Sequence, residues 1–206
     1  RMTGTEEALV FDSSAVVAGR CAPADAIYPC VTMPGVSLMP APASGEDLVP
    51  ERVMLRLVPL LKRYFDRVIL DSPAGVGRGF RAAAAAAFAD CALIVCNSDP
   101  VCIRDASIVR RLLTELEVPQ QRLVINRFNA EYFGSLSAGR EDAGGLRDLD
   151  DVIDQSGVRL IGIVPEDRQM TAAFQRGCVP ADDLPGMTAL SRIAARMNGV
   201  SVPLSL

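Results

Sequence analysis

The chain has 206 residues, of which 50% are hydrophobic and 22% are charged, and its formal net charge is −4. We predict a single domain over residues 1–206, because this length suits one α/β domain and this apolar fraction rules out wholesale disorder. The negative charge argues against nucleic-acid binding, and the lack of histidine excludes His-dependent triads, His metal ligands and imidazole acid–base catalysis.

The cysteine pattern and the hydropathy indicate in which cellular compartment the protein resides. Six cysteines occur with no CxxC pair. Free thiols in a reducing cytoplasm are therefore favoured over zinc sites or disulfides. No run approaches the ~18 apolar residues that span a bilayer, and no signal-peptide pattern is visible. We predict a cytoplasmic protein.

In the first half of the chain, short apolar segments alternate with helical patterns. Val36–Met39 is a strand candidate. A helix is predicted from Pro50, and Pro59 is expected to kink or split it. The sequence RVILD, Arg67–Asp71, predicts a short buried strand, and Phe80–Ala89 predicts a helix.

The second half continues the alternation. The predicted strands are Ala92–Cys96, Arg122–Asn126 and Arg159–Val164. A helix capped by Asp148 is expected to end at Gly157, and the last two helices end near Arg176 and Asn198. Strands that are apolar along their whole length are covered on both faces, and their alternation with helices implies right-handed crossovers. The predicted fold is α/β, with a mostly parallel sheet flanked by helices.

Polar residues follow each of the four main predicted strands. The clusters are Asp71-Ser72-Pro73-Ala74-Gly75, Asn97-Ser98-Asp99-Pro100, Asn126-Arg127 and Pro165-Glu166-Asp167. Open parallel sheets bind ligands outside the carboxyl ends of their strands. Four clusters at such ends therefore predict a binding site there, although any single strand end can be polar merely because it meets solvent.

The chemistry of these clusters suits a nucleotide. Asp71 directly follows an apolar strand, the position from which P-loop NTPases hold Mg²⁺. Gly75, after a rigid Pro-Ala turn, lets the backbone approach a phosphate. Asn126 can both donate and accept hydrogen bonds, which suits the edge of a purine, and Pro165 can pack against such a ring. Taken singly, Asn126 and Arg127 are equally well explained as a solvated strand end.

Four segments in chain order, VILDSPAGVGRGFRAAAAAA, NSDPVCIRDAS, LVINRFN and LIGIVPEDRQMTAAFQRGCVP, carry a family resemblance. They resemble successive blocks of the MinD septum-site ATPases, which belong with ParA to the deviant Walker-A class of P-loop NTPases. The resemblance runs from about residue 4 to about residue 198. It implies a P-loop NTPase fold of the SIMIBI type, incomplete at the N-terminus.

The resemblance also assigns roles to residues. It makes Asp71 the catalytic Walker-B aspartate that organises Mg²⁺, and it makes the stretch containing Pro73, Ala74 and Gly75 the second switch. Asn126 and Arg127 would begin the adenine-side loop. Pro165, Glu166 and Asp167 would form its other wall.

The family resemblance further implies ATP and Mg²⁺ as cofactors and a homodimer that sandwiches ATP. An activating partner would stimulate hydrolysis, and a division inhibitor would bind the ATP dimer at the inner membrane to place the septum. Arg104 and Asp105 resemble the helix start near that partner surface. Ser107 stands where the family commonly has another aspartate, which weakens the expectation of inhibitor binding there.

The departures from the family are informative. No Gly-Lys-Ser/Thr occurs, and the one lysine, Lys62, lies late in a predicted helix. The chain as written is therefore expected to bind and hydrolyse ATP poorly. Its final residues carry no positive charge after Arg196 and include Pro203, so we expect no sedimentation with anionic vesicles unless an amphipathic helix is missing.

We hypothesise that the chain is part of a longer ATPase, which the DNA sequence upstream of Arg1 would test. In the family, the phosphate-binding strand lies inside the sheet, so its loss would leave unpaired backbone and an apolar slot. Two alternatives stay open at this point. One is a ParA-type or flagellar-number ATPase of the same family, and the other is a non-enzymatic dimerisation or binding domain that has lost its P-loop.

Overall fold

A computed structural model describes residues 3–5, 9–42, 49–73, 77, 80, 90–129 and 149–204. The chain divides into two compact units, one of residues 1–89 with 173–179 and the other of residues 90–172 with 180–206. The two units are not placed relative to one another, so the single domain predicted over residues 1–206 stays a prediction. No helix in the described ranges is both long and apolar enough to cross a bilayer.

The first unit is made of short elements. Its described residues form α1 (Ser13–Val17), the 3₁₀ helix η2 (Pro23–Ala26), the antiparallel strands β1 (Tyr28–Pro29) and β2 (Ser37–Leu38), and α2 (Glu51–Leu61). β2 falls inside the predicted strand Val36–Met39. Lys62 is the C-cap of α2, which agrees with its predicted position late in a helix. Of the kink or split predicted at Pro59, the split is wrong, because α2 continues to Leu61, and the kink stays a prediction. Pro59 lies in the last turn, where few residues follow it, and Lys62 N still donates to Val58 O at 3.0 Å.

The predicted strand at Arg67–Asp71 is also wrong for this structure. The stretch belongs to no helix or strand, and Ile69 is 91% exposed. A strand is stable only where its backbone N–H and C=O groups pair with a neighbour. Among the described strands, none pairs with this stretch. The predicted helix Phe80–Ala89 lies outside the described residues, apart from Phe80.

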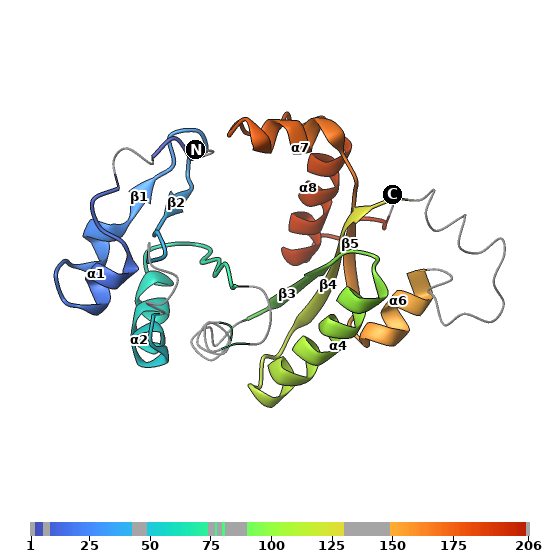
Figure 1. The fold of residues 1–206 in the computed structure, drawn as a ribbon, viewed down its shortest axis with the longest axis horizontal. Helices are drawn as coiled ribbons and strands as arrows, with labels where there is room; N and C mark the ends of the chain where they lie inside the picture. The colour runs from blue at the N-terminus through green and yellow to red at the C-terminus, as the bar shows by residue number, and fades with distance from the viewer. Residues whose placement is uncertain are drawn as a thin grey trace. The chain divides into compact units, whose positions relative to one another are not determined.

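The second unit contains the predicted parallel sheet. Strands β3 (Ala92–Cys96), β4 (Gln121–Phe128) and β5 (Leu160–Pro165) lie side by side in that order, and both pairs are parallel (Figure 1). The helices that follow them are α4 (Pro100–Glu115), α6 (Leu149–Ser156), α7 (Arg168–Gln175) and α8 (Pro185–Met197), although residues 173–175 of α7 are grouped with the first unit. Figure 1 shows α8 on one side of the strands and α4 with α6 on the other. The predicted α/β fold is thereby confirmed.

The helix ends of this unit follow the local sequence signals. Gly157 closes α6 with a φ of 65°, the left-handed conformation that favours glycine after a helix. The predicted cap Asp148 lies outside the described residues. α7 and α8 end at Gln175 and Met197, each next to its predicted end.

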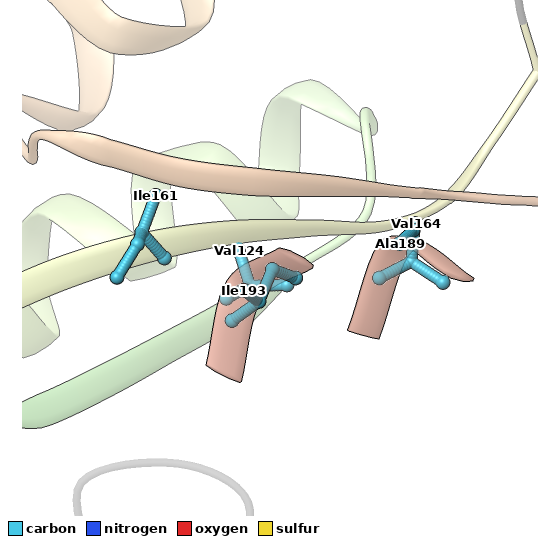
Figure 2. Close-up of a cluster of buried hydrophobic side chains, with 5 residues drawn as sticks. All are labelled: Val124, Ile161, Val164, Ala189 and Ile193. Atoms are coloured by element: carbon cyan, nitrogen blue, oxygen red, sulfur yellow. The ribbon is translucent and has the colours of Figure 1, made fainter. Parts of the chain in front are cut away.

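A cluster of buried aliphatic side chains joins α8 to the sheet. Its members are Val124, Ile161, Val164, Ala189 and Ile193 (Figure 2). Ala189 and Ile193 are four residues apart in α8, so they face the strands together. Gly162 of β5 allows the close approach, since a Cβ there would lie 2.2 Å from Ile193 Cγ1.

The strands differ in how well they are covered. β4 is apolar and buried on both faces at Leu123, Val124 and Ile125, as predicted. The prediction is wrong for β3, where Leu93 and Val95 are 41% and 60% exposed. Val95 pairs in register with Val124 and so shares the face that α8 covers. In the described part of the chain α8 packs on β5 and β4, which leaves this face of β3 open.

The six cysteines are free thiols, and they are expected to differ sharply in reactivity. Burial, followed by the neighbouring Cys102 thiol, raises the pKa of Cys96 to about 11. At pH 8 an ordinary thiol is about a quarter thiolate, whereas one with a pKa of 11 is about 0.1% thiolate. We expect iodoacetamide to modify the exposed Cys178 at least about 100-fold faster than Cys96, as followed by peptide mass spectrometry. Equal labelling rates would contradict the buried placement of Cys96.

Candidate functional site

The carboxyl ends of β3, β4 and β5 meet at one edge of the sheet, because the strands are adjacent and parallel. Polar residues were predicted at each of these ends. The structure brings together five of the predicted site residues from β4 and β5, namely Asn126, Arg127, Pro165, Glu166 and Asp167.

Asn126 and Arg127 form an irregularity within β4. The register between β4 and β5 shifts between Ile125 and Phe128, where β4 has one residue more than β5. Arg127 has a φ of 54°, in the left-handed region that is uncommon for residues other than glycine. Bulges of this kind redirect side chains and are frequent beside functional sites. Both side chains of this bulge are exposed at the sheet edge.

Two interactions join the bulge to the loop after β5. The backbone N–H of Glu166 donates to Phe128 O at 2.9 Å. Arg127 Nη2 lies 3.1 Å from Glu166 Oε1, in an ion pair whose side chains are 73% and 42% exposed. An exposed pair stabilises a fold by at most about 1 kcal/mol. The pair therefore adds only a weak link between the two loops, next to the backbone hydrogen bond from Glu166 to Phe128.

The amide of Asn126 has a defined orientation. Its Oδ1 accepts a hydrogen bond from Arg127 N at 3.0 Å, and a backbone N–H can donate only to the amide oxygen. Nδ2 is left as a donor with no partner among the described residues. Pro165 is partly exposed and pairs in register with Phe128, two residues after Asn126 along β4. An unpartnered donor and an apolar ring at the same edge of the sheet suit the edge and face of a heterocyclic base.

The Asp167 carboxylate is engaged by the protein itself. Oδ1 accepts from Gln169 N at 2.9 Å and from Met170 N at 3.0 Å, and Oδ2 accepts from Gly186 N at 3.4 Å. The hydrogen bond from Met170 lowers the pKa of Asp167 most; partial burial opposes it, and Gly186 and Gln169 add smaller lowering effects. Sequence reasoning missed this capping role, although an aspartate just before a predicted helix is its usual signal. Direct contact of Asp167 with a ligand stays a prediction.

The end of β3 is a helix cap as well. Asn97 Oδ1 accepts from Asp99 N at 3.1 Å, and Asp99 Oδ1 accepts from Val101 N at 2.7 Å at the start of α4. Pro100 occupies the first turn of α4, where its missing N–H costs nothing. This cluster shapes the sheet edge through backbone contacts.

The predicted magnesium and phosphate residues belong to the first unit. Asp71 and Pro73 are exposed, while Ala74 and Gly75 lie outside the described residues. Since the units are not placed relative to one another, the predicted meeting of Asp71 with Asn126 stays a prediction. Across the described ranges, no group of three or more Cys, Asp or Glu side chains is arranged to hold a metal ion.

Comparison with known proteins finds similar sequences and similar structures, although no family model matches the chain. It is 30% identical to the septum site-determining protein MinD of Synechocystis sp., over 98% of this chain and 74% of that protein. It is also similar to the solved MinC:MinD cell division protein complex of Aquifex aeolicus, with a TM-score of 0.85 and 28% identity over 100% of this chain and 80% of that one. The Pyrococcus horikoshii MinD structure with Mg-ADP has a TM-score of 0.76 at 20% identity, covers 96% of this chain and 76% of that one, and shows the fold alone.

Proposed function

Because the chain belongs to the MinD family of septum site-determining proteins, we propose that it acts in placing the division septum, through a site that binds the adenine of ATP. The observation that carries the proposal is the β4 bulge, which exposes Asn126 at the sheet edge where Pro165 ends β5 and pairs with Glu166 through Arg127. This arrangement supplies a donor and an apolar surface at the edge of the sheet where α/β folds bind ligands.

Each residue would have a distinct task in binding. Asn126 Nδ2 donates to an acceptor nitrogen of the base, while Oδ1 keeps one lone pair for an exocyclic amine. Pro165 packs against the ring. Asp71 would hold Mg²⁺ through water, and the ion would neutralise phosphate charge. The 206 residues contain no Gly-Lys-Ser/Thr to cradle the phosphates, so this chain by itself binds and hydrolyses ATP poorly.

We propose a homodimer across ATP, with an activating partner and a division inhibitor. The solved MinC:MinD complex of a relative supports binding to a partner protein. Arg104 and Asp105 are exposed near the start of α4. Ser107 Oγ donates to Arg104 O at 2.7 Å, so its hydroxyl is turned back onto the helix. It offers no negative charge to a partner at the position where an aspartate is common. Inhibitor binding through this surface should therefore be weak.

The base site is tested by NMR titration with adenosine and guanosine. Adenosine is expected to shift the side-chain amide of Asn126 and the backbone amide of Glu166. Asn126→Ala should weaken adenosine binding about 10-fold, since a site built around a hydrogen bond loses that contact. Asn198→Ala, at the C-cap of α8, is the matched control and should leave binding unchanged. Equal responses to the two nucleosides, or an Asn126→Ala variant that binds like the wild type, would contradict the proposal.

Isothermal titration with Mg-ATP tests whether a chain without Gly-Lys-Ser/Thr binds the nucleotide weakly. A dissociation constant weaker than about 100 µM is expected, because several backbone donors and a lysine normally supply most phosphate affinity. Phosphate release should stay at background. Micromolar affinity for the 206-residue chain would show that other residues replace the cradle, and would overturn this part of the proposal.

A further inference from the structure

We infer that Asp167 is a positioning residue, which sets the wall of the proposed base site by joining the start of α7 to the start of α8. This inference rests on the proposed function for its consequence in binding. It differs from the role expected of Asp167 as part of the ligand-contacting wall. Asp167 acts through Glu166 and Arg127 and does not touch the base.

The two carboxylate oxygens have different tasks. One accepts from Gln169 N and Met170 N, and this is all that an N-cap of α7 requires. The other accepts from Gly186 N, which lies 19 residues further along the chain in the first turn of α8. Backbone N–H groups in a first helical turn have no partner inside their own helix. A single side chain thus satisfies donors of two helices at once.

Gly186 also lies close to a side chain of α7. A Cβ at Gly186 would lie 2.4 Å from Met170 Sδ, whereas it would lie 3.6 Å from Asp167 Cβ, an ordinary contact distance. Even alanine would require Met170 to move. The glycine therefore leaves room for the Met170 side chain beside the start of α8.

The hydrogen bond from Gly186 to Asp167 links the loop after β5 to α8, which is itself packed on the sheet. α8 is held on the sheet through Ala189 and Ile193. Asp167 is attached to α8, and the next residue back along the chain is Glu166. Glu166 is hydrogen-bonded to Phe128 O and paired with Arg127. Without the hydrogen bond to Gly186, the loop after β5 would keep its bonds to the end of β4 and to α7 but would lose its link to α8.

The lowered pKa of Asp167 agrees with this geometry. Three backbone donors, with Met170 contributing most, favour the charged carboxylate. The side chain is therefore the stronger, ionised acceptor at neutral pH.

The experiment separates the hydrogen bonds that Asp167 makes to α7 from the one that it makes to α8. Serine at Asp167 keeps one oxygen for the cap of α7 but has none for Gly186. Asp167→Ser should therefore speed amide hydrogen exchange at Gly186 and Glu166 by about 10-fold, while Met170 changes by less than about 3-fold. Asp167→Asn, which presents an NH₂ group in place of the second oxygen, should behave likewise without loss of side-chain volume.

Asp12 is the matched control. Its Oδ1 caps α1 by accepting from Ser14 N at 2.8 Å and Ala15 N at 3.2 Å, the same offsets that Asp167 uses in α7. Asp12→Ser should leave exchange at Gly186 and Glu166 unchanged. If Asp167→Ser leaves Glu166 exchange as in the wild type, or if Asp12→Ser accelerates it equally, the inference is overturned.

Adenosine titration of the same variants separates this inference from the proposed function. If wild-type protein binds adenosine, Asp167→Ser should weaken binding about 5-fold at an unchanged melting temperature, and unchanged affinity would overturn the role in binding. If wild-type protein shows no response to adenosine, the proposed function fails. The exchange rates then still decide whether Asp167 positions the loop.

Discussion

Leu123→Ala is expected to lower the free energy of unfolding of the second unit by about 2–5 kcal/mol, the range for a fully buried leucine. Leu123 has no exposed surface and lies in β4, between β3 and β5. Its removal leaves a cavity that two neighbouring strands cannot close without breaking their ladders. Urea denaturation followed by circular dichroism gives the change, and hydrogen exchange of the β4 amides assigns it to this unit.

Leu93→Ala is the matched control for that prediction. Leu93 lies on β3 and is 41% exposed. It has therefore gained only part of the transfer free energy of a leucine side chain, and its loss should cost about 1 kcal/mol. If the two alanine variants were equally destabilised, the side of β3 that the described residues leave open would have to be covered in solution.

Gly162→Ala should destabilise the same unit by about 1–3 kcal/mol, the usual cost of overpacking a core. The added Cβ would lie 2.2 Å from Ile193 Cγ1 and 2.7 Å from Ile193 Cδ1. Either α8 must move away from β5 or Ile193 must leave its rotamer. Both changes disturb the aliphatic cluster shown in Figure 2.

A double-mutant cycle tests whether the clash with Ile193 causes this destabilisation. Ile193→Ala alone should cost about 2–5 kcal/mol, because Ile193 is 5% exposed. Combined with Gly162→Ala, the loss should be smaller than the sum of the two by at least about 1 kcal/mol, since the new methyl group fills part of the vacated space. Strict additivity would mean that the contact between Gly162 and Ile193 does not limit the packing of α8.

Much of the second unit was predictable from local patterns. The apolar segments at Ala92–Cys96 and Arg122–Asn126 became β3 and β4 in a parallel pair. The polar residues near the end of β4 and after β5 did gather at one edge, because parallel strands share their carboxyl ends, although β4 continues past Asn126 and Arg127 to Phe128. The fine geometry was not predictable: the bulge at Arg127 depends on register with a strand more than thirty residues away.

The same reasoning was wrong where pairing or covering decides the outcome. RVILD has the composition of a buried strand, yet its Ile69 is exposed, because composition cannot supply a hydrogen-bonding neighbour. Val95 is apolar but 60% exposed, since burial depends on whether a helix lies above it. The Arg127–Glu166 pair joins residues 39 positions apart, which no local signal indicates.

The amino-acid order alone determined the alternation of strands and helices, their ends at Gly157 and near Met197, and the family blocks from which an ATP-related function was expected. These depend on backbone preferences and periodicity within about ten residues. The tertiary structure alone decided that Asn126 turns a donor outward, that Arg127 meets Glu166, and that Asp167 spans two helices. The contacts of Arg127 and Asp167 join distant parts of the chain, and the bulge that orients Asn126 depends on its register with β5, so all three exist only once packing has set strand register and helix position.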